Sequence, residues 1–322
     1  MVTEEVRKLK PSDAVAIVEC FGRVYGESYG NELFHRPEML ARAIADGDVM
    51  SVGAVMNDGR ILAHMAMTSN GVGATPELGN TAVDPIARGR GLAWKVGEEL
   101  IEWCQELGNT AFLQYPTTDH HVMQREAAKH GNETGLMLSY IPAETDGKIR
   151  SGRRQLRQGA TIVYHRIGAN VESSEIYLPD YFHDEIKGYV ESCRLQRQYM
   201  KPLPDNAPTT SVVEERLENR RGLARLTVVS GGLDLETRIA DFASKDLPCL
   251  QIDFLMNDAY IDSSVGCARA QEFVFSGWLP GYRKVDVFRM QRVASQHTDL
   301  CPLLVNRPAQ ILLSKILRDI QP

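Results

Sequence analysis

Short apolar segments alternate with amphipathic ones along this chain, in an order that predicts a mixed α/β protein. The runs Met50–Met56 and Ile61–Thr68 flank Asn57-Asp58-Gly59-Arg60, and this Asn-Asp-Gly turn predicts a β-hairpin. A further apolar strand is expected at Leu78–Val83. From Leu92 to Leu107 apolar residues recur at helical spacing. The chain is therefore expected to pass from a hairpin into a strand, a turn and a helix.

The same reasoning predicts the other elements. In the first part of the chain we expect strands at 6–9, 110–114, 136–141 and 160–167, and helices at 14–21, 38–45 and 119–129. In the second part we expect helices at 181–198, 235–244, 268–273 and 310–320, and strands at 211–215, 224–229, 247–254, 275–280 and 285–291. The order begins again from about residue 172, which predicts two domains, 1–168 and 172–322.

The turn between strand and helix at residues 84–93 carries the most specific pattern. It reads Asp-Pro-Ile-Ala-Arg-Gly-Arg-Gly-Leu-Ala. A helix start leaves backbone N–H groups unpaired, and glycines let the backbone approach an anion. This combination predicts a pyrophosphate site. The spacing fits neither the Gly-x-Gly-x-x-Gly dinucleotide fingerprint nor a P-loop. The alternative is a glycine-rich turn that caps an ordinary helix.

The segment Val83–Ala93 resembles the acetyl-CoA signature of the GNAT N-acyltransferases, written Arg/Gln-x-x-Gly-x-Gly/Ala. Arg88, Gly91 and Ala93 occupy its three defined places. The resemblance implies a mixed, strongly twisted sheet flanked by helices, acetyl-CoA as co-substrate and no metal. It also implies a strand bulge near Ala82 and Val83, where backbone groups bind pantetheine. The cofactor-binding residues implied are Ala82, Val83, Arg88, Gly89, Arg90, Gly91, Leu92 and Ala93.

The second half of the chain looks like a diverged copy of this domain. Its corresponding turn reads Ser230-Gly231-Gly232-Leu233 and lacks the signature. We therefore expect residues 172–322 to bind CoA poorly or not at all and to have a structural or substrate-shaping role. An unrelated α/β substrate domain is the alternative.

The resemblance implies direct attack of a primary amine on the thioester, with transfer of an acetyl or short acyl group. Many members of the family place a tyrosine as general acid on the helix after the fifth strand, but here Ala127 is at that position. His120 and His121 are the substitutes we consider, since histidine titrates near neutrality. Glu77 is the preferred base, because a regular strand would point its side chain and that of Val83 to the same face.

Two further segments have open interpretations. Tyr25–Tyr29 either lines the acceptor site or is a packed loop. Residues 146–157 contain five basic side chains and either form a solvated loop or bind an anion, such as the 3′-phosphate end of CoA or a charged substrate.

Composition and charge indicate the compartment and the kinds of partner expected for this protein. The chain has 322 residues, a net charge of −6 and six scattered cysteines. We expect a cytoplasmic protein with reduced thiols, because the cysteines form no Cys-x-x-Cys motif and several lie in apolar periodic segments. No apolar run approaches the roughly 18 residues of a membrane span. The expected partner is a small-molecule amine, not a membrane or nucleic acid, and a homodimer is left open. The alternatives are a non-catalytic CoA-binding scaffold and a tandem transferase that uses another acyl donor, such as aminoacyl-tRNA. The acceptor cannot be read from the sequence.

Overall fold

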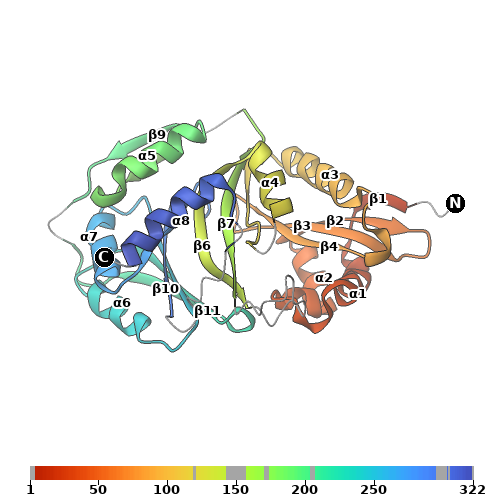
Figure 1. Cartoon of the computed structure of the whole chain (residues 1–322), viewed down its shortest axis with the longest axis horizontal. Coiled ribbons are helices and arrows are strands. Elements are labelled where there is room, and N and C mark those ends of the chain that lie inside the picture. The colour runs from red at the N-terminus through yellow and green to blue at the C-terminus, as the bar shows by residue number, and fades with distance from the viewer. Residues whose placement is uncertain are drawn as a thin grey trace.

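The computed structural model describes residues 4–118, 121–142, 157–169, 174–203, 207–294, 303 and 305–320. The first half of the chain alternates strands and helices as expected (Figure 1). Its elements are β1 (Glu4–Lys8), α1 (Ala14–Tyr25), α2 (Pro37–Ala45), β2 (Val49–Met56), β3 (Ile61–Thr68), β4 (Glu77–Val83), α3 (Leu92–Glu106), β5 (Ala111–Gln114), α4 (His121–His130), β6 (Asn132–Pro142) and β7 (Arg157–Arg166).

The second half also alternates strands and helices, and it ends in a helix of 14 residues. Its elements are β8 (Ser174–Tyr177), α5 (His183–Ser192), β9 (Arg197–Met200), β10 (Val212–Glu218), β11 (Leu223–Ser230), α6 (Leu235–Ala243), β12 (Cys249–Leu255), α7 (Ile261–Ala270), β13 (Val274–Leu279), β14 (Val287–Val293) and α8 (Arg307–Ile320). Among the described helices, none is long and apolar enough to cross a membrane.

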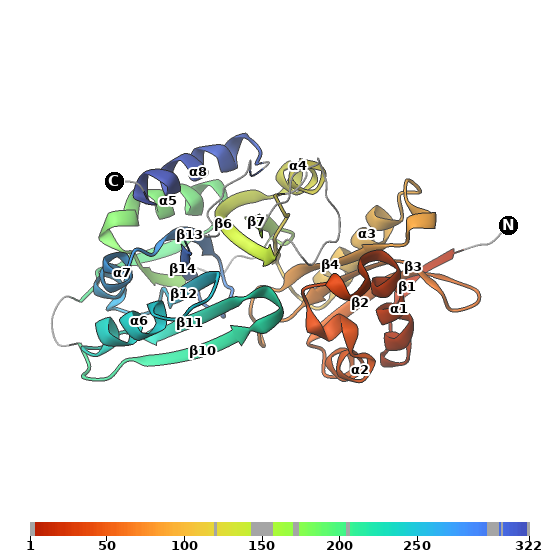
Figure 2. The ribbon, with the colours of Figure 1, turned by 60° about the horizontal axis from the view of Figure 1, so that its bottom comes forward.

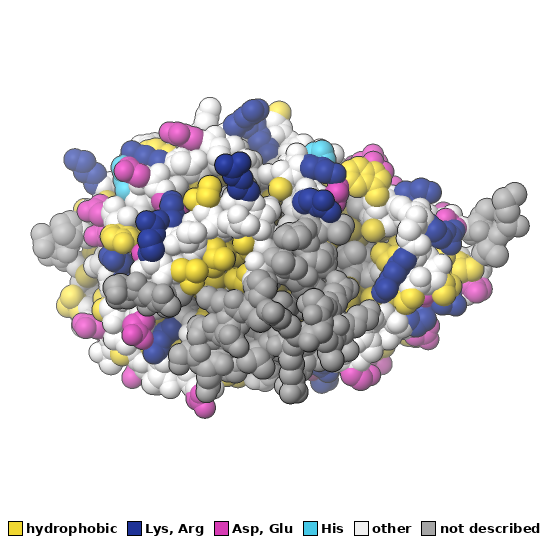
Figure 3. All heavy atoms as spheres, viewed as in Figure 1, with side chains coloured by type: hydrophobic (Ala, Val, Ile, Leu, Met, Phe, Trp, Pro, Cys, Tyr) yellow, Lys and Arg dark blue, Asp and Glu magenta, His cyan; other side chains and the backbone are white. Residues whose placement is uncertain are grey.

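One twisted, mostly antiparallel sheet of 12 strands runs through both halves of the molecule. Its order is β1-β2-β3-β4-β5-β7-β6-β13-β14-β12-β11-β10, while β8 and β9 form a separate parallel pair. Figure 2 shows the two halves at opposite ends of this sheet. On the face seen in Figure 3, acidic and basic side chains both occur over each half.

Helices cover both faces of the N-terminal part of the sheet. Helix α3 packs on β2 and β3 through Leu92, Val96 and Leu100, while α1 and α2 pack on the opposite face around Phe21 and Leu40. Apolar residues at helical spacing therefore give each helix one buried stripe.

The strand pairing of the first half is repeated in the second. In the first half β4 and β5 are parallel, and β7 lies between β5 and β6 in antiparallel pairing. In the second half β11 and β12 are parallel, and β14 lies between β12 and β13 in antiparallel pairing. A helix connects each parallel pair, as α3 and α6 respectively.

The halves meet at β6 and β13, where Gly135 pairs with Gly277. Neither glycine has room for a side chain, because a Cβ atom on either one would collide with atoms of the neighbouring strands. Beyond this point Gln291 of β14 replaces backbone pairing: its side chain accepts from Leu138 N–H at 2.8 Å and donates to Leu136 O at 2.9 Å. A common core spans both halves.

Two predicted helices of the second half have the wrong bounds. The helix expected at 181–198 ends at Ser192, and Arg197–Met200 instead forms β9 beside β8. The left-handed backbone of Arg194, with φ of 53°, breaks the helical path. The short helix expected at 268–273 is α7, which begins earlier at Ile261 and ends at Ala270.

Candidate active site

Strand β4 contains a bulge at its centre. Ala66 pairs with Gly79 and His64 with Ala82, so that one residue of β3 faces Asn80 and Thr81 of β4. Asn80 has a φ of 47°, a left-handed conformation that asparagine adopts more readily than most residues. The bulge lies two to three residues before the predicted position at Ala82 and Val83.

This bulge makes one expectation about Glu77 wrong. A regular strand would place Glu77 and Val83 on the same face, but the extra residue reverses the alternation between them. Leu78 and Val83 both contact the core beneath α3. Glu77 therefore points to the opposite face, where it lines a cavity.

Side chains from α1 and β3 hold the bulge in place. The Nδ1 of His64 lies 2.9 Å from Asn80 O, and the hydroxyl of Tyr25 donates to Thr81 O at 2.6 Å. The hydroxyl of Tyr29 donates to Asn80 Oδ1 at 2.9 Å. Burial lowers the pKa of His64 to about 4, so its ring is neutral at pH 7. With a neutral ring, Nδ1 carries the proton that Asn80 O accepts.

β4 and β5 diverge from Gly79 onward, where the bulge begins. The two parallel strands pair only at Glu77 with Leu113 and at Leu78 with Gln114. The space beside Gly79 is open, since a side chain there would meet no atom within 4 Å. The sheet is therefore split between β4 and the segment that follows β5.

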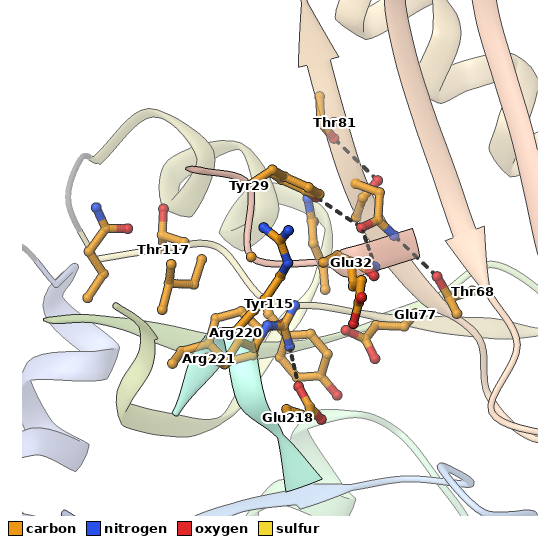
Figure 4. A pocket seen from close by; sticks show the side chains of 18 of the residues that line it. Tyr29, Glu32, Thr68, Glu77, Thr81, Tyr115, Thr117, Glu218, Arg220 and Arg221 are labelled. Carbon is orange, nitrogen blue, oxygen red and sulfur yellow. Dashed lines mark hydrogen bonds and ion pairs between the residues drawn. The ribbon is translucent and has the colours of Figure 1, made fainter. Parts of the chain in front are cut away.

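A cavity of about 590 Å³ lies at this split and receives residues from both halves of the chain (Figure 4). The N-terminal half contributes the connector after α1, the β4 bulge, the end of β5 and parts of α4, β6 and β7. The C-terminal half contributes the β10–β11 turn with Tyr282 and Arg289. Tyr25, Ser28 and Tyr29 line the cavity, and the two tyrosines also contact the bulge.

Glu77 lies in the wall of this cavity. Burial raises the pKa of its carboxyl above the usual range, and Arg221, Arg225 and Arg289 act in the opposite direction. A carboxyl group with a raised pKa accepts a proton more readily near neutral pH than an ordinary glutamate.

Tyr115 is a candidate that the sequence reasoning missed. It follows directly after β5, and its buried hydroxyl has no hydrogen-bond partner among the described residues. Burial raises the pKa of Tyr115 well above its usual range, and the charge of Glu77 adds to this rise. Its ring lies 5.8 Å from that of Tyr140, whose pKa burial raises to about 12. The signal in the sequence was its position at the end of a strand beside the split.

The second group that the sequence reasoning missed is the β10–β11 turn. Residues 216–225 carry four arginines, all of which line the cavity: Arg216, Arg220, Arg221 and Arg225. A run of charges between two predicted strands was the available signal.

The predicted pyrophosphate turn lies at the start of α3, outside the cavity lining. Gly89 and Gly91 have φ values of 78° and 72°, which favour glycine, and α3 begins at Leu92. Arg88 is exposed, whereas Arg90 forms an ion pair with Glu4 at 2.6 Å. A Cβ atom added at Gly89 or Gly91 would meet no atom within 4 Å, so the backbone of this turn is open to solvent.

The remaining predicted cofactor residues frame this turn. Ala82 is buried against α1, Val83 packs beneath α3, Leu92 is buried and Ala93 is half-buried. Asp84 is a turn residue: its Oδ1 accepts from Ile86 N–H, while Arg23 and Arg60 each contact its Oδ2 at 2.8 Å.

The remaining predicted residues are the two catalytic candidates at the start of α4, Ala127 on that helix and the basic segment 146–157. His120 lies outside the described residues, and of His121 only its place as the first residue of α4 is described. Ala127, where the family has its tyrosine, is buried. The basic segment 146–157 lies outside the described residues except for Arg157, which begins β7.

The corresponding turn of the C-terminal half is filled by the chain itself. Gly231 N–H donates to Asp258 Oδ2 at 2.8 Å, and Ser211 N–H donates to Asp234 Oδ1 at 2.6 Å. The backbone of 208–211 covers Gly232. Strands β11 and β12 pair continuously from Leu223 to Val228, so no split opens between them.

Comparison with known protein families finds a match for part of the chain. Residues 15–131 match the model of the acetyltransferase (GNAT) family. Residues 15–131 are a GNAT acetyltransferase domain. No curated protein sequence matches the chain.

Solved structures similar to the chain match about half of it. The ribosomal-protein-S18-alanine N-acetyltransferase from Escherichia coli has 18% identity and a TM-score of 0.41, with 53% of this chain and 97% of that chain covered. A GNAT N-acetyltransferase from Escherichia coli in complex with CoA has 18% identity and a TM-score of 0.35, covering 52% and 83%. A phosphinothricin acetyltransferase from Sinorhizobium meliloti in complex with acetyl-CoA has 19% identity and a TM-score of 0.39, covering 52% and 89%.

The GNAT domain thus contains the bulged β4, the split beside it and the turn Arg88–Ala93. Among the described residues, no group of three histidine, cysteine or acidic side chains is placed to hold a metal ion. The ionisable side chains that line the cavity are carboxylates, phenols and guanidiniums.

Proposed function

We propose that this protein transfers the acetyl group of acetyl-CoA to a primary amine of a small molecule, within a ternary complex. The observation that carries the proposal is the split between β4 and β5, which opens beside the Asn80 bulge into a cavity containing Glu77. A thioester in the split and an amine in the cavity would meet in one place, and this orientation supplies much of the rate.

Acetyl-CoA fits the residues of the turn. The left-handed Gly89 and Gly91 and the first N–H groups of α3, at Leu92 and Ala93, would bind the pyrophosphate together with Arg88. Arg90 is the less direct candidate, because it is paired with Glu4. The split would take the pantetheine arm past Ala82 and Val83, where the opening beside Gly79 leaves backbone accessible.

The proposed reaction is direct attack. The amine nitrogen forms a bond to the thioester carbonyl carbon, the carbon–sulfur bond breaks, and the amine loses a proton to Glu77. The thiolate that leaves takes a proton from solvent. Tyr115 remains neutral because of its raised pKa, and it donates a hydrogen bond to the charge that develops at the thioester. His120 and His121 remain candidates for the same assistance.

We further propose that residues 172–322 are a degenerate GNAT-like domain that does not bind CoA. The repeated strand pairing supports a common origin for the two halves, and the filled turn at Gly231 and Gly232 supports the loss of the anion site. The described cysteines are free, which suits a reducing compartment such as the cytoplasm.

Acetylation of a panel of primary amines tests the proposed function. The wild type should acetylate at least one amine, and Glu77→Gln should lower kcat by about 100-fold or more, the usual contribution of a general base. Glu106→Gln is the matched control, since Glu106 is an exposed carboxylate on α3 outside the cavity. Equal activity of Glu77→Gln and the wild type would remove Glu77 as the base.

A further inference from the structure

The β10–β11 turn of the C-terminal half crosses into the GNAT domain. Arg220 Nη1 donates to the backbone oxygen of Glu27 at 3.3 Å. The Arg221 guanidinium lies over the ring of Tyr140 at 4.5 Å, and its side chain passes beside Gly30. These contacts fix two arginines from one half of the molecule in the cavity of the other, as Figure 4 shows.

The arginines that line this cavity are only partly paired with acidic side chains among the described residues. Arg289 forms a buried two-point contact with Asp253 at 2.6 and 2.7 Å, and Arg225 lies 3.7 Å from the same carboxylate. Arg221 pairs with Glu218 at 3.2 Å. In contrast, neither Arg216 nor Arg220 forms an ion pair with any residue that the structure describes, although both line the cavity.

The described contacts of Arg220 are with a backbone oxygen and a histidine ring. Its Nη1 approaches Glu27 O and, at 3.5 Å, the Nε2 of His35. A guanidinium carries five N–H donors in a planar fork that matches a carboxylate. Arg220 therefore presents unbalanced positive charge to the same cavity that Glu77 lines.

We infer that the acceptor is an amine that also carries a carboxylate, of the amino-acid class, and that Arg220 and Arg221 bind this carboxylate while the amino group lies at Glu77. This inference rests on the proposed function. The cavity of about 590 Å³ holds both ends of such a molecule, within the usual range for small-ligand sites. Arg221, held by Glu218 and Tyr140, orients the bound carboxylate, and Arg220 supplies the unpaired charge.

The C-terminal half then has a defined role. It contributes no acyl-donor site, but its β10–β11 turn supplies the arginines that select the acceptor. A neutral amine would leave the charge of Arg220 unmatched, whereas an amino acid matches Glu77 and Arg220 at its two ends.

The test compares amino acids with their carboxamides as acceptors, at saturating acetyl-CoA. α-, β- and γ-amino acids are each paired with the corresponding carboxamide, which keeps the size and removes the charge. For the acid that is used best, kcat/KM should exceed that of its carboxamide by about 10- to 100-fold, as expected for charge-assisted hydrogen bonds. Arg220→Ala should remove most of this preference through KM and leave the affinity for acetyl-CoA unchanged.

The matched control is Arg238→Ala, which removes an exposed arginine of α6 outside the cavity and should keep the preference. Arg221→Lys, which keeps a charge, should give a partial loss if Arg221→Ala does not fold. Equal use of acids and carboxamides by the wild type, or an unchanged preference in Arg220→Ala, would overturn the inference while the proposed function stands.

If no amine is turned over, equilibrium binding still distinguishes the proposed function from the proposed carboxylate site. In the presence of CoA, the wild type should bind the amino acid better than the carboxamide, and Arg220→Ala should not. That result without turnover would contradict the proposed function and support the carboxylate site. Equal binding of both compounds would overturn the carboxylate site.

Discussion

At the scale of single residues, two opposing effects act on the pKa of Glu77. Burial disfavours its charged form, while Arg221, Arg225 and Arg289 favour it. The balance leaves the pKa above the usual range, so the carboxyl group titrates closer to neutral pH than most glutamates. The proposed base must be deprotonated to accept the amine proton.

The pH profile of the reaction should report this group. Because the active form is the carboxylate, kcat should fall as the pH decreases through the raised pKa of Glu77. Arg221→Gln removes a charge that lowers this pKa, so it should move the acidic limb of the profile to higher pH. Measurement of kcat against pH for both proteins checks the direction, and a limb that moves to lower pH would contradict the assignment.

Tyr115→Phe should separate stability from activity. The Tyr115 hydroxyl is buried without a described partner, so its removal should leave the melting temperature unchanged or raise it slightly. If the hydroxyl stabilises developing charge at the thioester, kcat should nevertheless fall by about 10-fold or more. Thermal unfolding and kcat are measured on the same preparation. A fall in stability without a change in kcat would assign Tyr115 a structural role only.

At the scale of elements, β4 depends on a neutral histidine. His64 is 1% exposed and contacts both Asn80 O and Ser51 Oγ, and its pKa is lowered from 6.5 to about 4. The unfolded chain therefore binds a proton that the folded chain does not between these pH values. Stability is present above pH 6.5 and is lost as the pH falls toward 4.

Chemical denaturation at several pH values tests this linkage. At roughly 1.4 kcal/mol per pKa unit, His64 alone should account for up to about 3 kcal/mol of stability lost between pH 6.5 and 4. His64→Gln should be less stable at pH 7 and should lose less stability over the same range. Burial also lowers the pKa of His165 to about 4, so His165 adds to the dependence of stability on pH. The informative quantity is therefore the difference between the wild type and His64→Gln. An identical slope in His64→Gln would contradict this account.

Local patterns predicted most elements because each has a single strong signal. Asn-Asp-Gly marked the β2–β3 hairpin, and the glycine turn marked the start of α3. The β4 bulge lies close to the predicted Ala82 and Val83, but its exact position at Asn80 and Thr81 depends on contacts from Tyr25, Tyr29 and His64, which are distant in sequence. The arginines of the β10–β11 turn were missed for the same reason: only the joined sheet brings them to Glu77.

At the scale of the whole molecule, the shared sheet makes the two halves one folding unit. Gln291 is fully buried and satisfies two backbone groups of β6. Gln291→Ala leaves both unsatisfied and should reduce the free energy of unfolding by about 2–5 kcal/mol. Unfolding should remain a single transition because the core spans both halves. Gln198→Ala, at an exposed position of β9, is the control and should change little. Two separate transitions in the wild type would contradict a common core.

The central claim is that the GNAT domain binds acetyl-CoA at the turn Arg88–Ala93 and that the C-terminal half does not. Calorimetric titration of the full chain with acetyl-CoA tests it most directly. The account predicts one site per chain, lost in Arg88→Ala combined with Gly91→Glu, while circular dichroism shows the variant folded. Two sites per chain would mean that the turn at Gly231 and Gly232 still binds CoA. Absence of binding, or affinity retained in the variant, would contradict the proposed site.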